Sequence, residues 1–99
     1  MRIAIVCALA LTAAPLAGVA QERSAGRDLA ASCAMCHGTD GRGAGGYQPL
    51  AGMAKDELVR KFSGFRSGAT PATVMHQISK GYTDQQIQLI AEYFSAQKK

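Results

Sequence analysis

The 99-residue sequence has no tryptophan, and aromatic residues make up only 6% of it. It has no internal repeat and no alternation of polar and apolar residues, the pattern that would predict strands. Acidic residues are also few, since 7 Asp and Glu stand against 11 Lys and Arg, for a formal net charge of +4. Loss of Arg2 with the N-terminal segment described next lowers this charge further, so nucleic-acid binding is not favoured. These absences give no support for β-strands or for nucleic-acid binding.

A long apolar run is found only at the N-terminus. Arg2 is followed by the nearly uninterrupted apolar segment 3–16 and then by small residues, which is the pattern of a secretion signal. An uncleaved membrane anchor is the alternative, but Pro15 interrupts a run that is shorter than the roughly 20 apolar residues of a spanning helix. We therefore expect a cleaved signal peptide, residues 1–20, and a single periplasmic domain, residues 21–99, with no membrane span.

Cysteine is scarce: Cys7 falls within the predicted signal peptide, which leaves Cys33 and Cys36. In an oxidising compartment such a pair suits a disulfide, and the C-x-x-C spacing also suits a redox-active pair or half of a zinc site. His37 decides among these, because C-x-x-C-H is the haem-attachment sequence, in which each thiol adds to a vinyl group and the imidazole binds iron. Zinc would need two further ligands, and the only other histidine is His76. The sequence thus predicts one covalently bound haem c.

Two other motifs, a thioredoxin-like cysteine pair and a dinucleotide-binding glycine pattern, are excluded by the sequence around them. A thioredoxin-like pair lies at a strand-to-helix junction, and no β-rich run precedes Cys33. Residues 41–46 match the G-x-G-x-x-G pattern of dinucleotide sites, but that pattern works only after a strand and at the start of a helix. Here it follows a helical segment and leads into Tyr47. We expect the glycines of residues 38–46 to form a flexible loop beside the haem.

Two helices are predicted in the first two thirds of the mature chain. Ser24 is expected to cap a helix that runs into the attachment motif. A second, amphipathic helix is predicted over 56–66, where Leu58, Val59, Phe62 and Phe65 fall at helical spacing. The basic residues Arg60, Lys61 and Arg66 are expected to point outward from it. This second helix should pack its apolar face on the core.

Two further helices are predicted near the C-terminus. Thr70 and Pro71 have the pattern of an N-cap followed by proline at the first helical position, opening a short helix that Gly81 ends. Residues 83–86 form a capping box, Thr-Asp-Gln-Gln, at the start of the last helix. The buried stripe of that helix is expected to be Ile87, Ile90 and Phe94.

The sixth position of the iron is expected to be filled by a methionine, whose neutral thioether favours the ferrous state. Met35 lies inside the attachment motif and is tethered to the His37 side of the ring, so it should be packing or surface. Met53 is expected to form a wall of the haem pocket. Met75, 38 residues after His37, is far enough along the chain to reach the other face, and we predict it as the ligand. His76 is the rival, with a surface histidine as the simpler interpretation.

A haem-ligating histidine usually donates its second ring N–H to a fixed acceptor. The carbonyl of Pro49 is the predicted acceptor for His37, because proline is rigid. One of the tyrosines is expected to contact a haem propionate.

The order of the helices, the early C-x-x-C-H and the later methionine resemble the class I cytochrome c family across residues 24–97. That resemblance implies a small all-α fold wrapped around one haem. Within the family, segment 65–75 together with Lys80-Gly81-Tyr82 and residues 91–94 is similar to the cytochrome subunit of flavocytochrome c sulfide dehydrogenase. There the cytochrome docks on an FAD-containing subunit that oxidises sulfide, and its haem takes electrons from the flavin. Well-known members carry two haem domains, whereas this chain has one attachment motif.

The resemblance implies a protein that transfers single electrons and is not an enzyme by itself. Its expected donor is the FAD-containing subunit of a sulfide dehydrogenase, and it would pass electrons on to downstream redox proteins. The alternative is a freely diffusing periplasmic carrier of the short bacterial cytochrome c type. A haem enzyme or gas sensor would require an open distal position, against which Met75 argues.

Overall fold

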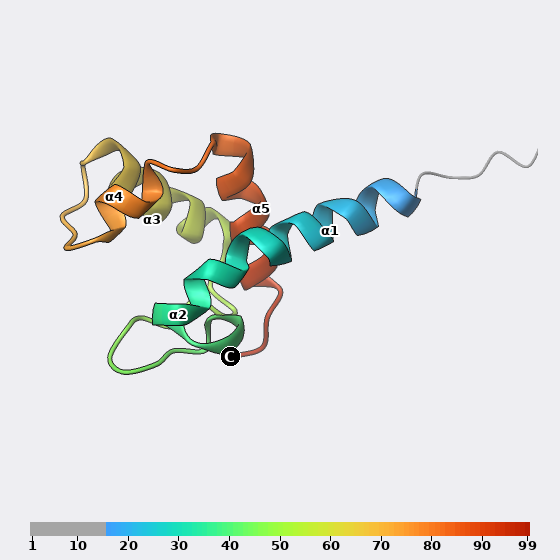
Figure 1. The fold of residues 1–99 in the computed structure, drawn as a ribbon, viewed down its shortest axis with the longest axis horizontal. Coiled ribbons are helices and arrows are strands. Elements are labelled where there is room, and N and C mark those ends of the chain that lie inside the picture. The colour runs from blue at the N-terminus through green and yellow to red at the C-terminus, as the bar shows by residue number, and fades with distance from the viewer. Residues whose placement is uncertain (1–15) are drawn as a thin grey trace, which may run out of the picture.

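The computed structural model describes residues 16–99, so most of the predicted signal peptide lies outside the described residues. Regular structure in this range is helical, apart from an isolated bridge between Ala44 and Tyr47. The helices are α1 (Leu16–Ala30), α2 (Ala34–His37), α3 (Lys55–Ser67), α4 (Met75–Ser79) and α5 (Asp84–Ser95), with 3-10 turns η1 (Ala31–Cys33) and η2 (Thr39–Gly41). The predicted all-α class is confirmed over these residues (Figure 1). No helix described in this range combines the length and the apolarity needed to cross a membrane.

Helix α1 begins earlier than the sequence analysis predicted. It starts at Leu16, so Ser24 lies in its interior and the predicted N-cap at Ser24 is wrong. Most residues between the two are good helix formers, such as alanine, glutamine, glutamate and arginine, and the helix propagates through them. The N-terminal part of α1 projects beyond the rest of the molecule (Figure 1), and residues 20–24 are exposed.

Helices α1 and α5 touch where Gly26 meets the backbone of α5. A Cβ atom at Gly26 would lie 2.7 Å from the carbonyl oxygen of Leu89 and 3.6 Å from Cβ of Tyr93. Contacts below about 3 Å are not seen for real Cβ atoms. The two helices therefore approach this closely because residue 26 has no side chain.

The core lies where α5 meets α1 and α3. Its buried residues are Ala30, Leu58, Ile90, Ala91 and Phe94. The predicted stripe of α5 is confirmed, since Ile87, Ile90 and Phe94 are each at most 2% exposed. The capping box is confirmed as well: Thr83 accepts a hydrogen bond from the backbone N–H of Gln86 at 3.1 Å, and the Gln86 side chain accepts one from the N–H of Thr83 at 2.9 Å.

The connection between α3 and α4 is longer than predicted. Helix α3 agrees with the predicted segment 56–66 and ends at Gly68, whose φ of 83° is left-handed. Thr70 then donates its backbone N–H to the carbonyl of Gly64. This hydrogen bond closes the C-terminal end of α3, so Thr70 does not begin a new helix. Helix α4 begins only at Met75, so the predicted start at Thr70-Pro71 is wrong. The β-branched pair Thr73-Val74 also disfavours an earlier start.

The C-terminal helix is tied to the loop after the attachment motif by one polar network. The Tyr93 hydroxyl donates to Asp40 Oδ1 at 2.5 Å, and Arg42 donates to Asp40 Oδ2 at 3.2 Å. Arg42 also donates to the carbonyl of Lys98 at 3.2 Å. The hydrogen bond to Asp40 raises the pKa of Tyr93, with smaller contributions from burial and from the negative charge of Asp40. Folding thus favours the protonated tyrosine.

This network predicts a stability difference that depends on pH. Because the folded-state pKa of Tyr93 is raised, its contribution is complete below the pKa of an unfolded tyrosine, about 10, and is lost as the pH rises through the folded value. A Tyr93→Phe protein should therefore be less stable than the unaltered protein at pH 7, and the difference should shrink above pH 10. Chemical unfolding at several pH values measures it.

The matched control is the same substitution in an Asp40→Gly background, where the acceptor is gone and glycine suits the positive φ of 52° at this position. There Tyr93→Phe should cost much less at pH 7. A loss that is equal in both backgrounds, or that does not change with pH, would contradict the assignment.

Candidate haem site

The attachment segment forms one wall of an apolar cavity of about 310 Å³. Cys33 ends the turn η1, and Cys36 and His37 lie on the short helix α2. All three residues line the cavity, and both cysteines are unpaired thiols. The other walls come mainly from apolar side chains: Leu58, Phe62 and Phe65 of α3, Met75 and Ile78 of α4, and Ile90 and Phe94 of α5. The chain thus gathers the attachment motif and Met75 around one space.

His37 is held through one ring nitrogen. Its Nδ1 lies 2.6 Å from the carbonyl oxygen of Gln48, so Nδ1 carries the proton and donates it, and Nε2 keeps its lone pair for a metal. The predicted acceptor, Pro49, is wrong by one residue. The ring of Pro49 instead faces Gly43, where an added Cβ would lie 3.0 Å from the proline Cγ. A residue that precedes proline is restricted to an extended conformation, and this fixes the Gln48 carbonyl.

Of the methionines described, Met75 is the one that lines the cavity. It is the first residue of α4, and the α3–α4 connection brings it to the attachment segment. Met35 is 90% exposed, in agreement with the prediction that it is packing or surface. Met53 packs against the hydrophobic core cluster and does not line the cavity, so its predicted place in the pocket wall is wrong.

His76 does not line the cavity either. It is half-buried and not the surface histidine that was expected, because α4 lies against α3. Its Nδ1 is buried without a hydrogen-bond partner among the described residues, as is the hydroxyl of Ser79 one turn later. Adjacent residues on a helix point about 100° apart, which explains why Met75 faces the cavity and His76 does not.

Two features of the cavity were not predicted from the sequence. Lys61 was expected on the outer face of α3, but it lines the cavity. The signal was present, because Lys61 is three residues after Leu58 and four before Phe65, which places it on the same face. Ser32, which also lines the cavity, shares a hydrogen bond of 3.2 Å with the Tyr82 hydroxyl.

The residues present fit a covalently bound haem. Two thiols and an imidazole lie on one short segment, the imidazole is anchored with Nε2 free, and a thioether and apolar walls complete the cavity. Burial raises the pKa of the Cys33 thiol. Within residues 16–99 no three His, Cys, Asp or Glu side chains gather into a possible metal site. A larger groove of about 580 Å³ along α1 and α5 contains none of the predicted site residues.

Comparison with known proteins identifies the family. The family model for cytochrome c matches residues 24–98. The chain is 41% identical over 71 residues to the cytochrome subunit of sulfide dehydrogenase from Chlorobaculum tepidum, covering 72% of this chain and 64% of that protein. It is 34% identical over 83 residues to cytochrome c-554(548) from Halomonas halodenitrificans, covering 80% of this chain and all of that protein.

Comparison with solved structures also indicates a cytochrome c fold. The fold is similar to that of cytochrome c4 from Acidithiobacillus ferrooxidans, with a TM-score of 0.66 and 29% sequence identity over 74% of this chain and 50% of the other. The chain thus spans about half of that structure and less than two thirds of the sulfide dehydrogenase subunit. The match over residues 24–98, the helical fold and the cavity around the C-x-x-C-H segment together make this chain a member of the cytochrome c family, whose haem c is covalently bound.

Proposed function

We propose that this chain transfers single electrons through one haem c that is bonded to Cys33 and Cys36 and ligated by His37 and Met75. The observation that carries this proposal is the common cavity lined by all four residues, although Met75 is 38 residues from His37 in the sequence. When bound, the haem supplies a one-electron ferric–ferrous couple. The protein acts as an electron carrier and is not an enzyme by itself.

The residues around the cavity have distinct tasks in this proposal. The thiols of Cys33 and Cys36 fix the position of the macrocycle by two thioether bonds. The Gln48 carbonyl, 2.6 Å from Nδ1, orients the His37 ring and leaves Nε2 as the nitrogen that would ligate the iron. The thioether of Met75 favours the ferrous state, and the apolar walls exclude water, which raises the reduction potential further.

Export to the periplasm is the second part of the proposal. Residues 1–20 are a signal peptide, and residues 21–99 are the mature single domain. The exposure of residues 20–24 supports this, because the core residues that the structure describes begin at Ala30, after the proposed cleavage site. N-terminal sequencing of the exported protein would test it: a start at Gln21 agrees, and an intact Met1 disagrees.

The proposed donor is the FAD-containing subunit of a sulfide dehydrogenase. Similarity to the cytochrome subunit of the Chlorobaculum tepidum sulfide dehydrogenase supports this assignment. From the haem, electrons would pass to downstream redox proteins. A second candidate is a freely diffusing carrier, which is favoured by the match to the full length of cytochrome c-554(548).

One experiment separates the two candidates. The protein is purified from its native source at mild salt, its flavin content is measured, and sulfide is added while the haem absorbance is followed. Reduction that requires a co-purifying flavoprotein supports the dehydrogenase subunit. A flavin-free protein that does not respond to sulfide but accepts electrons from other donors supports the free carrier. A protein without covalent haem would contradict both.

A further inference from the structure

The haem cavity contains one strongly basic side chain. Among the described residues that line it, Lys61 is the only lysine or arginine, and no aspartate or glutamate lines it. The other lining residues are apolar or uncharged polar groups, the two cysteines and His37. Beside such apolar walls, an ammonium group is stabilised by a partner of opposite charge.

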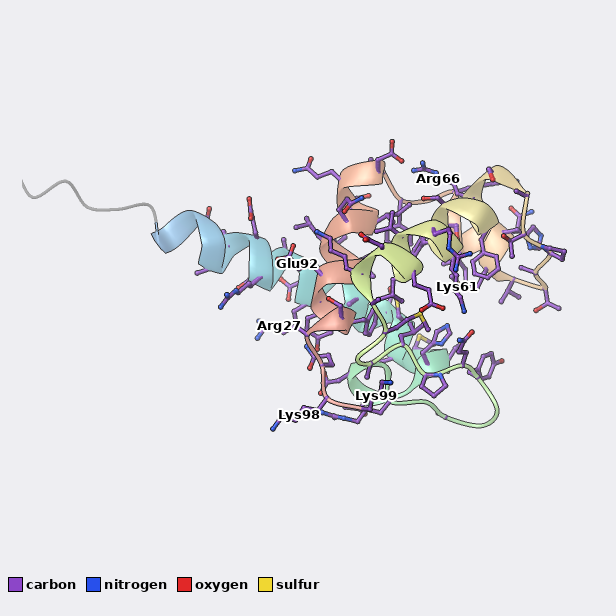
Figure 2. The ribbon with its side chains drawn as sticks, turned by 180° about the vertical axis from the view of Figure 1, so that it is seen from behind. Arg27, Lys61, Arg66, Glu92, Lys98 and Lys99 are labelled. Atoms are coloured by element: carbon purple, nitrogen blue, oxygen red, sulfur yellow. The ribbon has the colours of Figure 1, made fainter. Side chains whose placement is uncertain are left out.

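The position of Lys61 explains how it reaches the cavity. It lies on α3 between Leu58 and Phe65, both of which line the same space. Figure 2 shows Lys61 on the side of α3 that faces the segment carrying the sulfur atoms, whereas Arg66 lies on the far side. The Lys61 side chain is 32% exposed, so its stem can cover apolar wall while its amine reaches the rim.

The partner within the protein is Glu57, but the contact is weak. Nζ of Lys61 lies 3.6 Å from Oε1 of Glu57, one helical turn earlier, and the Glu57 side chain is 43% exposed. Exposed ion pairs of this kind contribute little to helix stability, because solvent screens the charges. Glu57 therefore holds Lys61 loosely and leaves it free to accept a stronger partner inside the cavity.

The other basic residues of α3 are not available for this. Arg66 is paired with Asp84 and donates to the carbonyl of Tyr82 at 3.2 Å, and Lys55 does not line the cavity. Arg60 is exposed and does not line the cavity. Lys61 is thus the basic residue of α3 that the fold directs to the haem.

We propose that Lys61 binds a propionate carboxylate of the haem and thereby raises the reduction potential. This inference rests on the proposed haem site. A carboxylate placed in an apolar cavity requires a compensating cation, and Lys61 is the lysine that lines it. Neutralising that carboxylate removes negative charge that would favour ferric iron. Lys61 is a positioning and tuning residue, and Glu57 competes with the haem carboxylate for its amine.

The test compares the midpoint potentials of haem-loaded variants. In Lys61→Gln, the ferrous-to-ferric ratio at a fixed applied potential should fall on the order of tenfold, as expected for removal of a unit charge at a separation of about 10 Å and an effective dielectric constant of about 20–40. Lys61→Arg should restore most of the ratio. Glu57→Gln should raise it, because the competitor is gone. The matched control is Lys80→Gln, since Lys80 is exposed and does not line the cavity.

The salt dependence of the potential shift distinguishes a lysine that is paired with the haem carboxylate from a lysine that only lies near the haem. The Debye length falls from about 30 Å at 0.01 M to about 3 Å at 1 M, so the effect of an exposed charge disappears while that of a pair inside the cavity persists. A Lys61→Gln shift that equals the Lys80→Gln shift, or that vanishes at high salt, overturns the inference. Lys61→Gln that fails to retain haem while Lys61→Arg retains it supports a haem-binding role. Absence of haem from the unaltered protein overturns the proposed function itself.

Discussion

A Met75→Ala protein should bind carbon monoxide rapidly and completely when reduced, whereas the unaltered protein should bind it slowly or not at all. The reason is that Met75 lines the haem cavity, and as the proposed ligand its thioether would occupy the iron position that carbon monoxide needs. The reduction potential should also fall by on the order of 0.1 V or more, a modest part of the roughly 0.8 V over which axial ligands set haem potentials. Stopped-flow mixing and a redox titration measure the two effects.

Two controls make the assignment specific. Met53→Ala removes a methionine that packs on the core and does not line the cavity, so it should lower stability without opening the iron. His76→Ala removes the rival ligand and should leave the slow reaction with carbon monoxide unchanged. If carbon monoxide bound rapidly to His76→Ala and not to Met75→Ala, then His76, and not Met75, would be the iron ligand. Rapid binding by the unaltered protein would instead favour a haem enzyme or gas sensor.

A Gly26→Val protein should lose about 3 kcal/mol of unfolding free energy, the upper end of the usual cost of overpacking. Even the first atom of the new side chain would lie 2.7 Å from the carbonyl oxygen of Leu89, which belongs to the backbone of α5 and has no rotamer to change. For a domain of this size the melting temperature should drop by more than about 10 °C. Thermal unfolding followed by circular dichroism checks this.

Helix propensity alone predicts that a side chain at residue 26 stabilises the protein, which is the opposite of the effect expected from the clash. Replacing a helical glycine by alanine normally stabilises a protein by up to about 1 kcal/mol. Gly26→Ala should nevertheless destabilise, because the clash outweighs the gain. Gly81→Ala, in the turn after α4, is the control for an added Cβ without a clash, since that atom meets only the carbonyl of Ile78 at 3.4 Å. A stabilised Gly26→Ala protein would show that α1 and α5 separate at little cost.

The features that were predicted correctly depend on short-range patterns. The capping box from Thr83 to Gln86 closes within four residues, and the stripe of Ile87, Ile90 and Phe94 follows directly from the period of the helix. The C-x-x-C-H segment is equally local, which is why the place of Cys33 and His37 beside one cavity was expected. In each case the residues that interact are neighbours in the sequence.

The features that were missed depend on distant partners. Thr70 has the local pattern of a helix start, but its N–H is taken by Gly64 of the preceding helix. The acceptor for His37 is Gln48, because the ring of Pro49 packs at Gly43. Lys61 was placed outward with its basic neighbours, although the cavity extends to its side of α3. Sequence patterns rank such alternatives only weakly, because tertiary packing decides among them.

The connection between α3 and α4 has a consequence for the kinetics of the site. Among residues 71–74, Pro71 has no N–H, and the amides of Ala72, Thr73 and Val74 donate to no acceptor in the described structure. Few backbone hydrogen bonds therefore need to break for this segment to lift away, while the opposite side of the cavity is closed by the bond between His37 and Gln48. Hydrogen exchange should be faster at residues 72–74 than in helices α3 and α5, and the slow entry of carbon monoxide should follow the opening rate of that segment.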